Sequence, residues 1–221
     1  MEWEIQFYHD VTPSHNFIND LFAFLLSHNV KYNPKESTYF IIPQGIKSIS
    51  LKREERSTID LNKIINTYLI YDIKTTNLGI YLEYYGDVDF YFYLHVIPTN
   101  NKYFISFDTN EYMIPDEKSF FSFVNLCKDA FEKFNFSYGA SRSQWQNAIP
   151  PSENEFIMEK PDIVNFYGKR MADKVNRKKL LSTPAKHVEE LVNGGILLIA
   201  CTNPPGCPDE MERIRKHLGY I

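Results

Sequence analysis

The sequence predicts an α+β fold in which helices pack on a largely antiparallel sheet. In the middle of the chain, runs rich in aromatic and branched residues alternate with turn sequences such as Gly86-Asp87, which is typical of an antiparallel meander. Apolar residues recur at helical spacing in 15–27 and 117–134. The last third, 161–221, has the order of a C-terminal helix–hairpin–helix unit.

Strands of the first half are expected where apolar and polar residues alternate, or where β-branched and aromatic residues are concentrated. Trp3, Ile5 and Phe7, for example, alternate with polar neighbours. The expected strands are 3–8, 38–42, 46–51, 78–85, 88–97 and 103–107.

Helices of the same part are expected where a capping residue precedes a periodic apolar segment. Ser14 is a suitable N-cap, and Thr58 or Asp60 lies near the start of the second segment. Asp116 and Glu117 open the third, where negative charge is favoured by the helix dipole. The expected helices are 15–27, 59–69 and 117–134.

Residues 137–160 show no periodicity and include a double proline, so they predict an irregular crossing loop. Such a loop is either a binding element, for which Trp145 and Arg142 are the candidate residues, or a tether that packs Trp145 into a crevice. The predicted organisation is an α+β domain with an aromatic-rich sheet over 1–136, this loop, and a C-terminal unit over 161–221 in the same globule.

The C-terminal unit has the clearest local pattern. Asn193-Gly194-Gly195 lies between two apolar runs and predicts a hairpin turn. Glu189 and Glu190 precede it on one strand, so their carboxylates should point to opposite faces. The expected elements are a strand at 164–167, a helix at 169–181, strands at 186–191 and 195–201, and a helix at 208–217.

Aromatic residues are the unusual feature of the composition: 17 Phe, 15 Tyr and 2 Trp make up 15% of the 221 residues. Most of them fit a bulky core, and a stacking platform for bases or sugars is the sharper alternative. Along 89–95 both faces carry bulky residues, which predicts either a central covered strand or a face that exposes tyrosines. Tyr84, Tyr91 and Tyr93 are therefore candidate binding residues, with Trp145 and Arg142.

The charge balance argues against a broad nucleic-acid surface, because the net charge is −4 and the isoelectric point is about 5.9. Basic clusters at 47–56 and 169–179 are interspersed with or flanked by acids and are interpreted as solvated faces. Residues 1–10 lack a signal-peptide pattern, and no apolar run reaches membrane-spanning length. We expect a soluble cytoplasmic protein without membrane contact; the sequence gives no oligomeric state.

No catalytic, metal or cofactor motif is present. Residues 139–143 lack the GxSxG pattern, and no phosphate-binding glycine motif occurs. Cys201 and Cys207 do not have zinc or redox spacing; a disulfide between them is geometrically possible, but two free thiols are predicted for a reducing compartment. Cys127 lies on an apolar helical stripe and is expected in the core.

Several short patterns of the last third carry a family resemblance: Phe166-Tyr167-Gly168, then Arg177-Lys178-Lys179-Leu180-Leu181, Pro184-Ala185, Val188-Glu189-Glu190-Leu191 and Gly194-Gly195-Ile196-Leu197-Leu198. Together they resemble the C-terminal half of bacterial immunity proteins that neutralise polymorphic or contact-dependent toxins, in the group catalogued as immunity protein fifty-two. Many members have Gly where this chain has Asn176. The resemblance covers about a quarter of the chain and assigns no functional residue. It implies a non-enzymatic binder of a toxin.

Three classes of function follow as hypotheses. The first is a protein-binding module, such as an immunity protein that neutralises a cognate toxin, and it makes the chain a non-enzyme. The second is an enzyme, such as a hydrolase or a nucleotide-modifying enzyme, whose site is assembled from scattered residues. The third is a nucleic-acid-binding protein that uses the aromatic strands, although the acidic balance disfavours nucleic acid as a partner.

Overall fold

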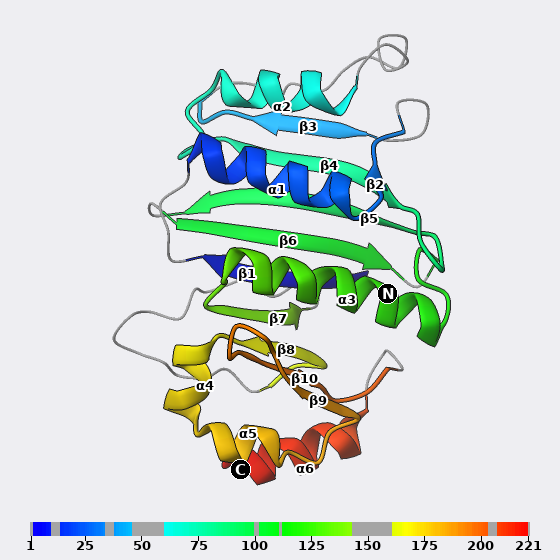
Figure 1. Cartoon of the computed structure of the whole chain (residues 1–221), viewed down its shortest axis with the longest axis vertical. Helices are drawn as coiled ribbons and strands as arrows, with labels where there is room; N and C mark the ends of the chain where they lie inside the picture. The colour runs from blue at the N-terminus through cyan, green and yellow to red at the C-terminus, as the bar shows by residue number, and fades with distance from the viewer. Residues whose placement is uncertain are drawn as a thin grey trace. The chain divides into compact units, whose positions relative to one another are not determined.

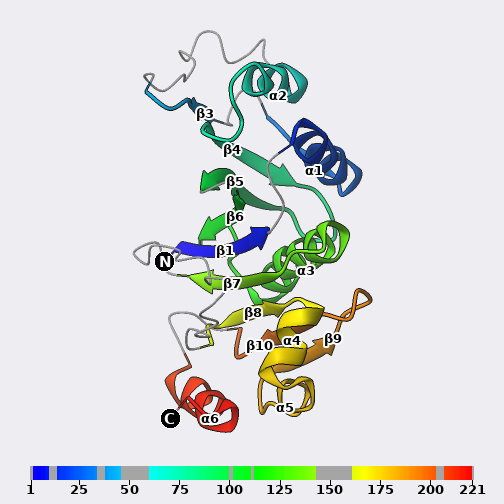
Figure 2. The same ribbon diagram turned by 90° about the vertical axis from the view of Figure 1, so that its left-hand side faces the viewer.

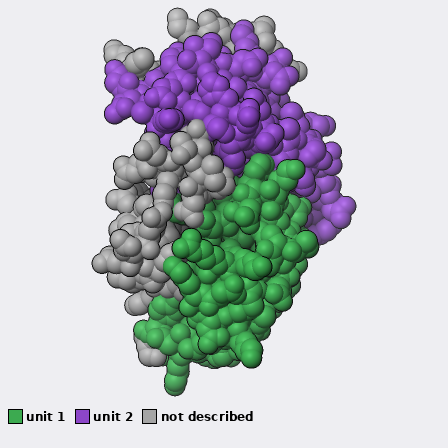
Figure 3. Space-filling model, turned by 60° about the vertical axis from the view of Figure 1, so that its left-hand side comes forward, with its two compact units in different colours: residues 1–9, 124–221 green, residues 10–123 purple. Residues whose placement is uncertain are grey.

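A computed structural model describes residues 2–9, 14–33, 38–45, 60–99, 102–110, 112–142, 161–202 and 207–220. It shows an α+β fold built on antiparallel strands, as the sequence predicts (Figure 1). The chain divides into two compact units, coloured separately in Figure 3. Unit 1 comprises residues 1–9 and 124–221, and unit 2 comprises residues 10–123.

Unit 2 is a sheet with helices on one face. Its strands are β2 (Val30–Lys31), β3 (Tyr39–Ile42), β4 (Asn77–Tyr84), β5 (Phe90–Thr99) and β6 (Lys102–Asn110). They follow the order β2-β4-β5-β6, with β3 also paired to β4, and every pairing is antiparallel. The helices of unit 2 are α1 (His15–Ser27), α2 (Leu61–Leu69) and the start of α3 (Glu117–Phe134). The predicted meander and the three predicted helices are thus confirmed.

The capping chemistry of these helices is also confirmed. The Ser14 hydroxyl accepts a hydrogen bond from the Phe17 N–H (3.1 Å) at the start of α1. Asp60, one of the two predicted caps, accepts from the Lys63 N–H (2.8 Å) at the start of α2. Each cap satisfies an N–H that the helix leaves without an internal partner.

Strand alternation gives the sheet of unit 2 two different faces. Leu82, Leu94 and Phe107 are fully buried and belong to the core face. Phe90, on the same face, meets Phe123 of α3 edge-to-face at 5.8 Å. Figures 1 and 2 show α1 lying against the same sheet. The helices therefore cover this face, and the opposite face carries the alternate residues.

Unit 1 also consists of antiparallel strands and helices, and its central strands are covered on both faces. Its strands are β1 (Glu2–His9), β7 (Tyr138–Arg142), β8 (Val164–Tyr167), β10 (Ile196–Ile199) and β9 (His187–Glu190), in that order across the sheet. Its helices are the remainder of α3, α4 (Lys169–Val175), α5 (Arg177–Leu181) and α6 (Pro208–Leu218).

The aromatic residues of unit 1 fill the layer between the sheet and α3. Phe7 of β1 stacks on Phe136 at 5.0 Å and meets Phe166 of β8 edge-on at 5.2 Å. Phe131 of α3 lies 5.1 Å from Phe166. On the other face, α4, α5 and α6 pack around Tyr167 and the neighbouring residues of β10. Burial from both sides explains why all four residues of β8 and of β10 are buried.

The predicted irregular loop over 137–160 is wrong at its beginning, because residues 138–142 form β7. This strand pairs with β1 on one side and β8 on the other. Gly139 hides the strand pattern, yet it is needed there: a Cβ at this position would lie 2.3 Å from the Phe7 ring. The remainder of the loop, with Trp145, lies outside the described residues, as does the strand predicted at 46–51.

The single helix predicted over 169–181 is also wrong. Asn176 has φ 99° and ψ 90°, which interrupts the helix and separates α4 from α5. The Asn176 side chain then accepts a hydrogen bond from the Lys179 N–H (3.2 Å) and caps α5. A residue that tolerates positive φ and can act as an N-cap makes the break possible.

The cysteines differ in part from prediction. Cys127 is fully buried in α3, as expected. Cys201 and Cys207, predicted as free thiols, instead form a disulfide, with their Cα atoms 6.3 Å apart. This Cα–Cα distance lies within the range that a disulfide can bridge. The bridge joins the end of β10 to the start of α6.

Candidate functional site

The face of the unit 2 sheet opposite the helices carries most of its accessible aromatic and ionisable side chains. Three cross-strand rows define it: Lys31–Glu83–Tyr91, Tyr81–Tyr93–Asp108 and Gly79–His95–Ser106. We call these nine residues the tyrosine face. In unit 1, by contrast, both faces of the central strands are buried under helices. The tyrosine face is therefore the candidate functional site.

Three tyrosines at the centre of this face hold one another in place. Tyr81 stacks on Tyr91 with centroids 5.8 Å apart and planes 7° from parallel, and it meets Tyr93 edge-on at 4.9 Å. Tyr93 in turn meets the His95 ring edge-on at 6.1 Å. Tyr91 remains 37% exposed. The result is a pre-ordered aromatic surface on two strands, β4 and β5.

Gly79 allows an aromatic side chain from the next strand to extend this surface. A Cβ at Gly79 would lie 2.2 Å from the Phe40 ring, so the ring occupies the space a side chain would need. From β3, Phe40 thereby reaches across β4 and meets His95 of β5 edge-on at 5.6 Å. Glycine at this position is needed for close approach between side chain and backbone.

One end of the tyrosine face is a histidine–carboxylate pair. The Nδ1 atom of His95 lies 3.5 Å from Asp108 Oδ2, and both side chains are about one-quarter exposed. The Ser106 hydroxyl donates a hydrogen bond to Asp108 Oδ1. A hydroxyl has one proton to donate, so His95 does not activate Ser106 as a nucleophile in this arrangement. The pair can orient an imidazole and hold charge.

The other end is a buried carboxylate beneath exposed rings. Glu83 is only 2% exposed. Tyr85, which follows β4 and is 39% exposed, donates its hydroxyl to Glu83 Oε2, and this hydrogen bond raises the pKa of Tyr85 to about 12. The Lys31 ammonium stands 4.8 Å from the centroid of the Tyr85 ring.

The structure separates the residues that the sequence singled out. Tyr91 and Tyr93 lie together on the tyrosine face. Tyr84 lies on the opposite face, where it stacks on Phe90 at 4.4 Å. Arg142 ends β7 in unit 1, and its backbone pairs with Glu4. Trp145 lies outside the described residues.

Sequence reasoning missed Tyr81, Glu83 and His95 as members of the site. A signal for them was present. Tyr81 and Glu83 have the same parity on their strand, so both must point away from the buried leucines beside them. Placing them beside Tyr91 also requires the register across the β4–β5 turn, which the residues of a single strand do not determine.

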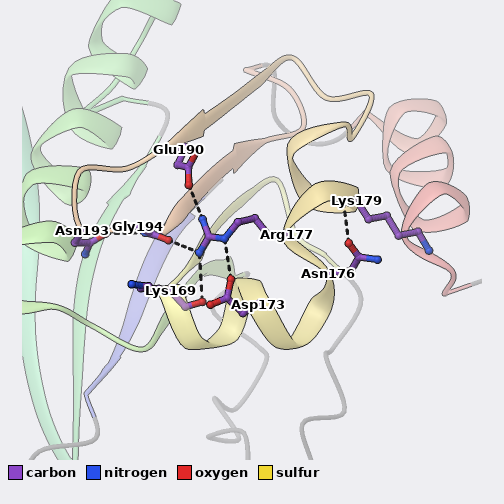
Figure 4. A network of polar contacts seen from close by, with 9 residues as sticks. Lys169, Asp173, Asn176, Arg177, Lys179, Glu190, Asn193 and Gly194 are labelled. Atoms are coloured by element: carbon purple, nitrogen blue, oxygen red, sulfur yellow. Dashed lines mark hydrogen bonds and ion pairs between the residues drawn. The ribbon is translucent and has the colours of Figure 1, made fainter.

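A second polar network, centred on Arg177 in unit 1, has a structural role (Figure 4). Arg177 donates to Asp173 of α4 (2.8 Å), to Glu190 of β9 (2.7 Å) and to the Gly194 carbonyl in the hairpin turn (2.6 Å). The hydrogen bond to Asp173 and the negative charges of both carboxylates raise the pKa of Arg177. Because it joins helix, strand and turn, this network holds the hairpin against α4 and α5.

The predicted orientation of the two adjacent glutamates is confirmed. Glu190 binds Arg177, whereas Glu189 points to the other face and lies 3.2 Å from the Lys128 ammonium of α3. Partial burial opposes ionisation of Glu189, but hydrogen bonds from His187 and Lys128 outweigh it and lower the pKa of Glu189. The two carboxylates cannot act as a catalytic pair.

Other classes of site find little support in the described part of the chain. No group of three or more His, Cys, Asp or Glu residues there could hold a metal ion. No helix within the described ranges has the length and apolar character to cross a bilayer. Comparison of the chain with protein-family models, with curated proteins and with solved structures found no match.

Proposed function

We propose that this chain is a non-enzymatic protein-binding module and that the tyrosine face is its binding surface. The observation that carries the proposal is the interlocked set of Tyr81, Tyr91 and Tyr93 on a sheet face that no helix in the described part of the chain covers. Tyrosine offers a large contact area at low cost in conformational entropy and is enriched at protein interfaces. A pre-ordered surface also reduces the entropy lost on binding.

The proposed partner is a toxin, which makes the chain an immunity protein that acts in the cytoplasm. The resemblance of 166–198 to immunity proteins supports this, as does the net charge of −4, which favours association with a basic partner. The positive φ at Asn176 is a conformation that glycine adopts freely, and glycine is what many members of the resembled group have there. The Cys201–Cys207 disulfide is more typical of an oxidising compartment, so location needs its own test.

The proposal is tested by co-expressing the chain with toxins encoded beside its gene. We expect protection from growth arrest and co-purification of the two proteins. The double variant Tyr81→Ala/Tyr91→Ala should lose both, while Tyr112→Ala, which removes a tyrosine that is 86% exposed and lies between β6 and α3, should retain both. Absence of protection and of a tight partner for the wild-type chain would overturn the proposal.

A second candidate, an enzyme, is favoured by one observation, the pair formed by His95 and Asp108. An aspartate on Nδ1 fixes the tautomer of a histidine and makes Nε2 available as a base. If this pair is catalytic, His95→Gln abolishes turnover of a hydrolase substrate. Nucleic-acid binding is disfavoured, because Glu83 and Asp108 place negative charge beside the rings and this charge repels a phosphate backbone.

A further inference from the structure

We propose that the acidic end of the tyrosine face is a receptor for an arginine side chain of the protein partner. The receptor consists of the Glu83 carboxylate and the rings of Tyr81, Tyr85 and Tyr91. This inference rests on the proposed function, because it assigns a chemistry to the partner of the same surface. It rests on three observations: a buried carboxylate oxygen without a partner, a set of aromatic faces around it, and a cation that already occupies one of these faces.

The first observation is the state of Glu83. Its Oε2 accepts from Tyr85, but its Oε1 is buried and has no hydrogen-bond partner among the described residues. Within the described part of the chain, no basic group lies within ion-pair distance of it; Lys31, directly opposite on β2, is directed to the Tyr85 ring instead. A buried carboxylate oxygen left in this state is costly, so a donor that reaches it gains substantial free energy.

The second observation is the arrangement of the rings. Tyr81 and Tyr85 share a face with Glu83, one on either side of it along the chain, and Tyr91 lies directly across on β5. Tyr81 and Tyr91 are stacked nearly parallel. Tyr85 and Tyr91 are each more than one-third exposed, so a ligand can reach both rings from solvent. The carboxylate thus has three tyrosine rings as its neighbours on the same face.

The third observation is the position of Lys31. Its ammonium lies over the Tyr85 ring at 4.8 Å, within the range of a cation–π interaction. The chain itself therefore shows that this surface accepts a cation. Negative charge is also nearby, because Asp89 and Glu83 both contribute to raising the pKa of Tyr85.

Arginine fits this combination better than lysine. A guanidinium group is planar, so it can stack on one ring while its N–H groups donate in the plane towards Glu83 Oε1. An ammonium group is a compact, strongly hydrated charge that cannot do both with the same geometry. The net charge of −4 favours association with such a cationic partner, and Glu83 with its neighbouring rings gives the arginine a fixed anchor.

The test uses ethylguanidinium as a probe of the arginine side chain, titrated into the full chain at constant ionic strength. NMR signals of the Tyr81, Tyr85 and Tyr91 rings should shift with a Kd on the order of 1 mM. Ethylammonium should bind at least several-fold more weakly. Glu83→Gln, which keeps the shape and removes the charge, should lose the response, and Tyr91→Leu should weaken it. Asp87→Asn, a charge change in the neighbouring β4–β5 turn, should leave it unchanged.

Two results would overturn the receptor. One is the absence of ring shifts in the wild-type chain, and the other is equal binding by the Glu83→Gln variant. Failure of the receptor can be distinguished from failure of the proposed function. If the partner binds the Glu83→Gln variant with unchanged affinity, the arginine receptor is wrong but the chain is still a binding module. If the receptor is correct, that substitution weakens the partner complex at least tenfold.

Discussion

At the scale of single residues, Asn176 shows how one backbone conformation determines a helix boundary. Its φ of 99° is one that side chains with a Cβ rarely adopt, and its side chain caps α5. Asn176→Ala keeps the strain and removes the cap, so the free energy of unfolding should fall by about 2 kcal/mol. Asn176→Gly removes the strain together with the cap and should stay within about 1 kcal/mol of the wild type. Urea unfolding measures both; equal losses would contradict this explanation.

The hydrogen bond between Tyr85 and Glu83 predicts a pH effect. It raises the folded-state pKa of Tyr85 from 10.0 to about 12, so its stabilising contribution is present below pH 10 and is lost as the pH rises towards 12. In Glu83→Gln the charged acceptor is absent, and the pKa of Tyr85 should return towards 10. Tyrosinate absorbance, compared between Glu83→Gln and Glu83→Gln/Tyr85→Phe, isolates this titration. An unchanged high pKa in Glu83→Gln would show that the hydrogen bond is not its cause.

At the scale of elements, Arg177 is the residue that joins α4, β9 and the hairpin turn. Its planar guanidinium group donates hydrogen bonds to all three elements at once, and a lysine ammonium cannot reproduce that geometry. Arg177→Lys should therefore lower the free energy of unfolding by about 1 to 2 kcal/mol. Arg213→Lys is the matched control, because its contact with Glu210 is exposed and 3.5 Å long and should contribute almost nothing. Similar melting temperatures for the two variants would exclude the structural role of Arg177.

Local patterns predicted elements well where one signal dominates. Ser14 and the following apolar stripe predicted α1 with its N-cap, and Asn193-Gly194-Gly195 predicted the β9–β10 hairpin. They were wrong where contacts between elements determine the local structure. Gly139 weakens the strand signal of β7, but the neighbouring strands and the Phe7 ring make a strand there favourable. Helix propensity also does not predict the break at Asn176, because it describes neither the positive φ nor the N-cap hydrogen bond of this residue.

At the scale of the whole molecule, the candidate site could be predicted only in part. Aromatic alternation indicated Tyr91 and Tyr93, because strand periodicity is a local property. Tyr84 was grouped with them, yet it faces the core, because it has the parity of the buried Leu82 on β4, and there it stacks on Phe90. The neighbours of Glu83, in turn, come from positions on two other strands, Lys31 on β2 and Tyr91 on β5. A site assembled across strands is thus specified by register, which is a property of the folded sheet.

The Cys201–Cys207 bridge connects the stability of the whole chain to its compartment. By loop-closure entropy, a bridge across so short a loop stabilises the fold by about 2 kcal/mol, so a reductant should lower the free energy of unfolding by that amount. The Cys201→Ser/Cys207→Ser variant should unfold like the reduced chain and be insensitive to reductant, while Cys127, buried in α3, stays unmodified in the native protein. Thiol alkylation in intact cells then tests the proposed cytoplasmic location: reactive Cys201 and Cys207 are expected there, and a fully protected pair would place the chain in an oxidising compartment.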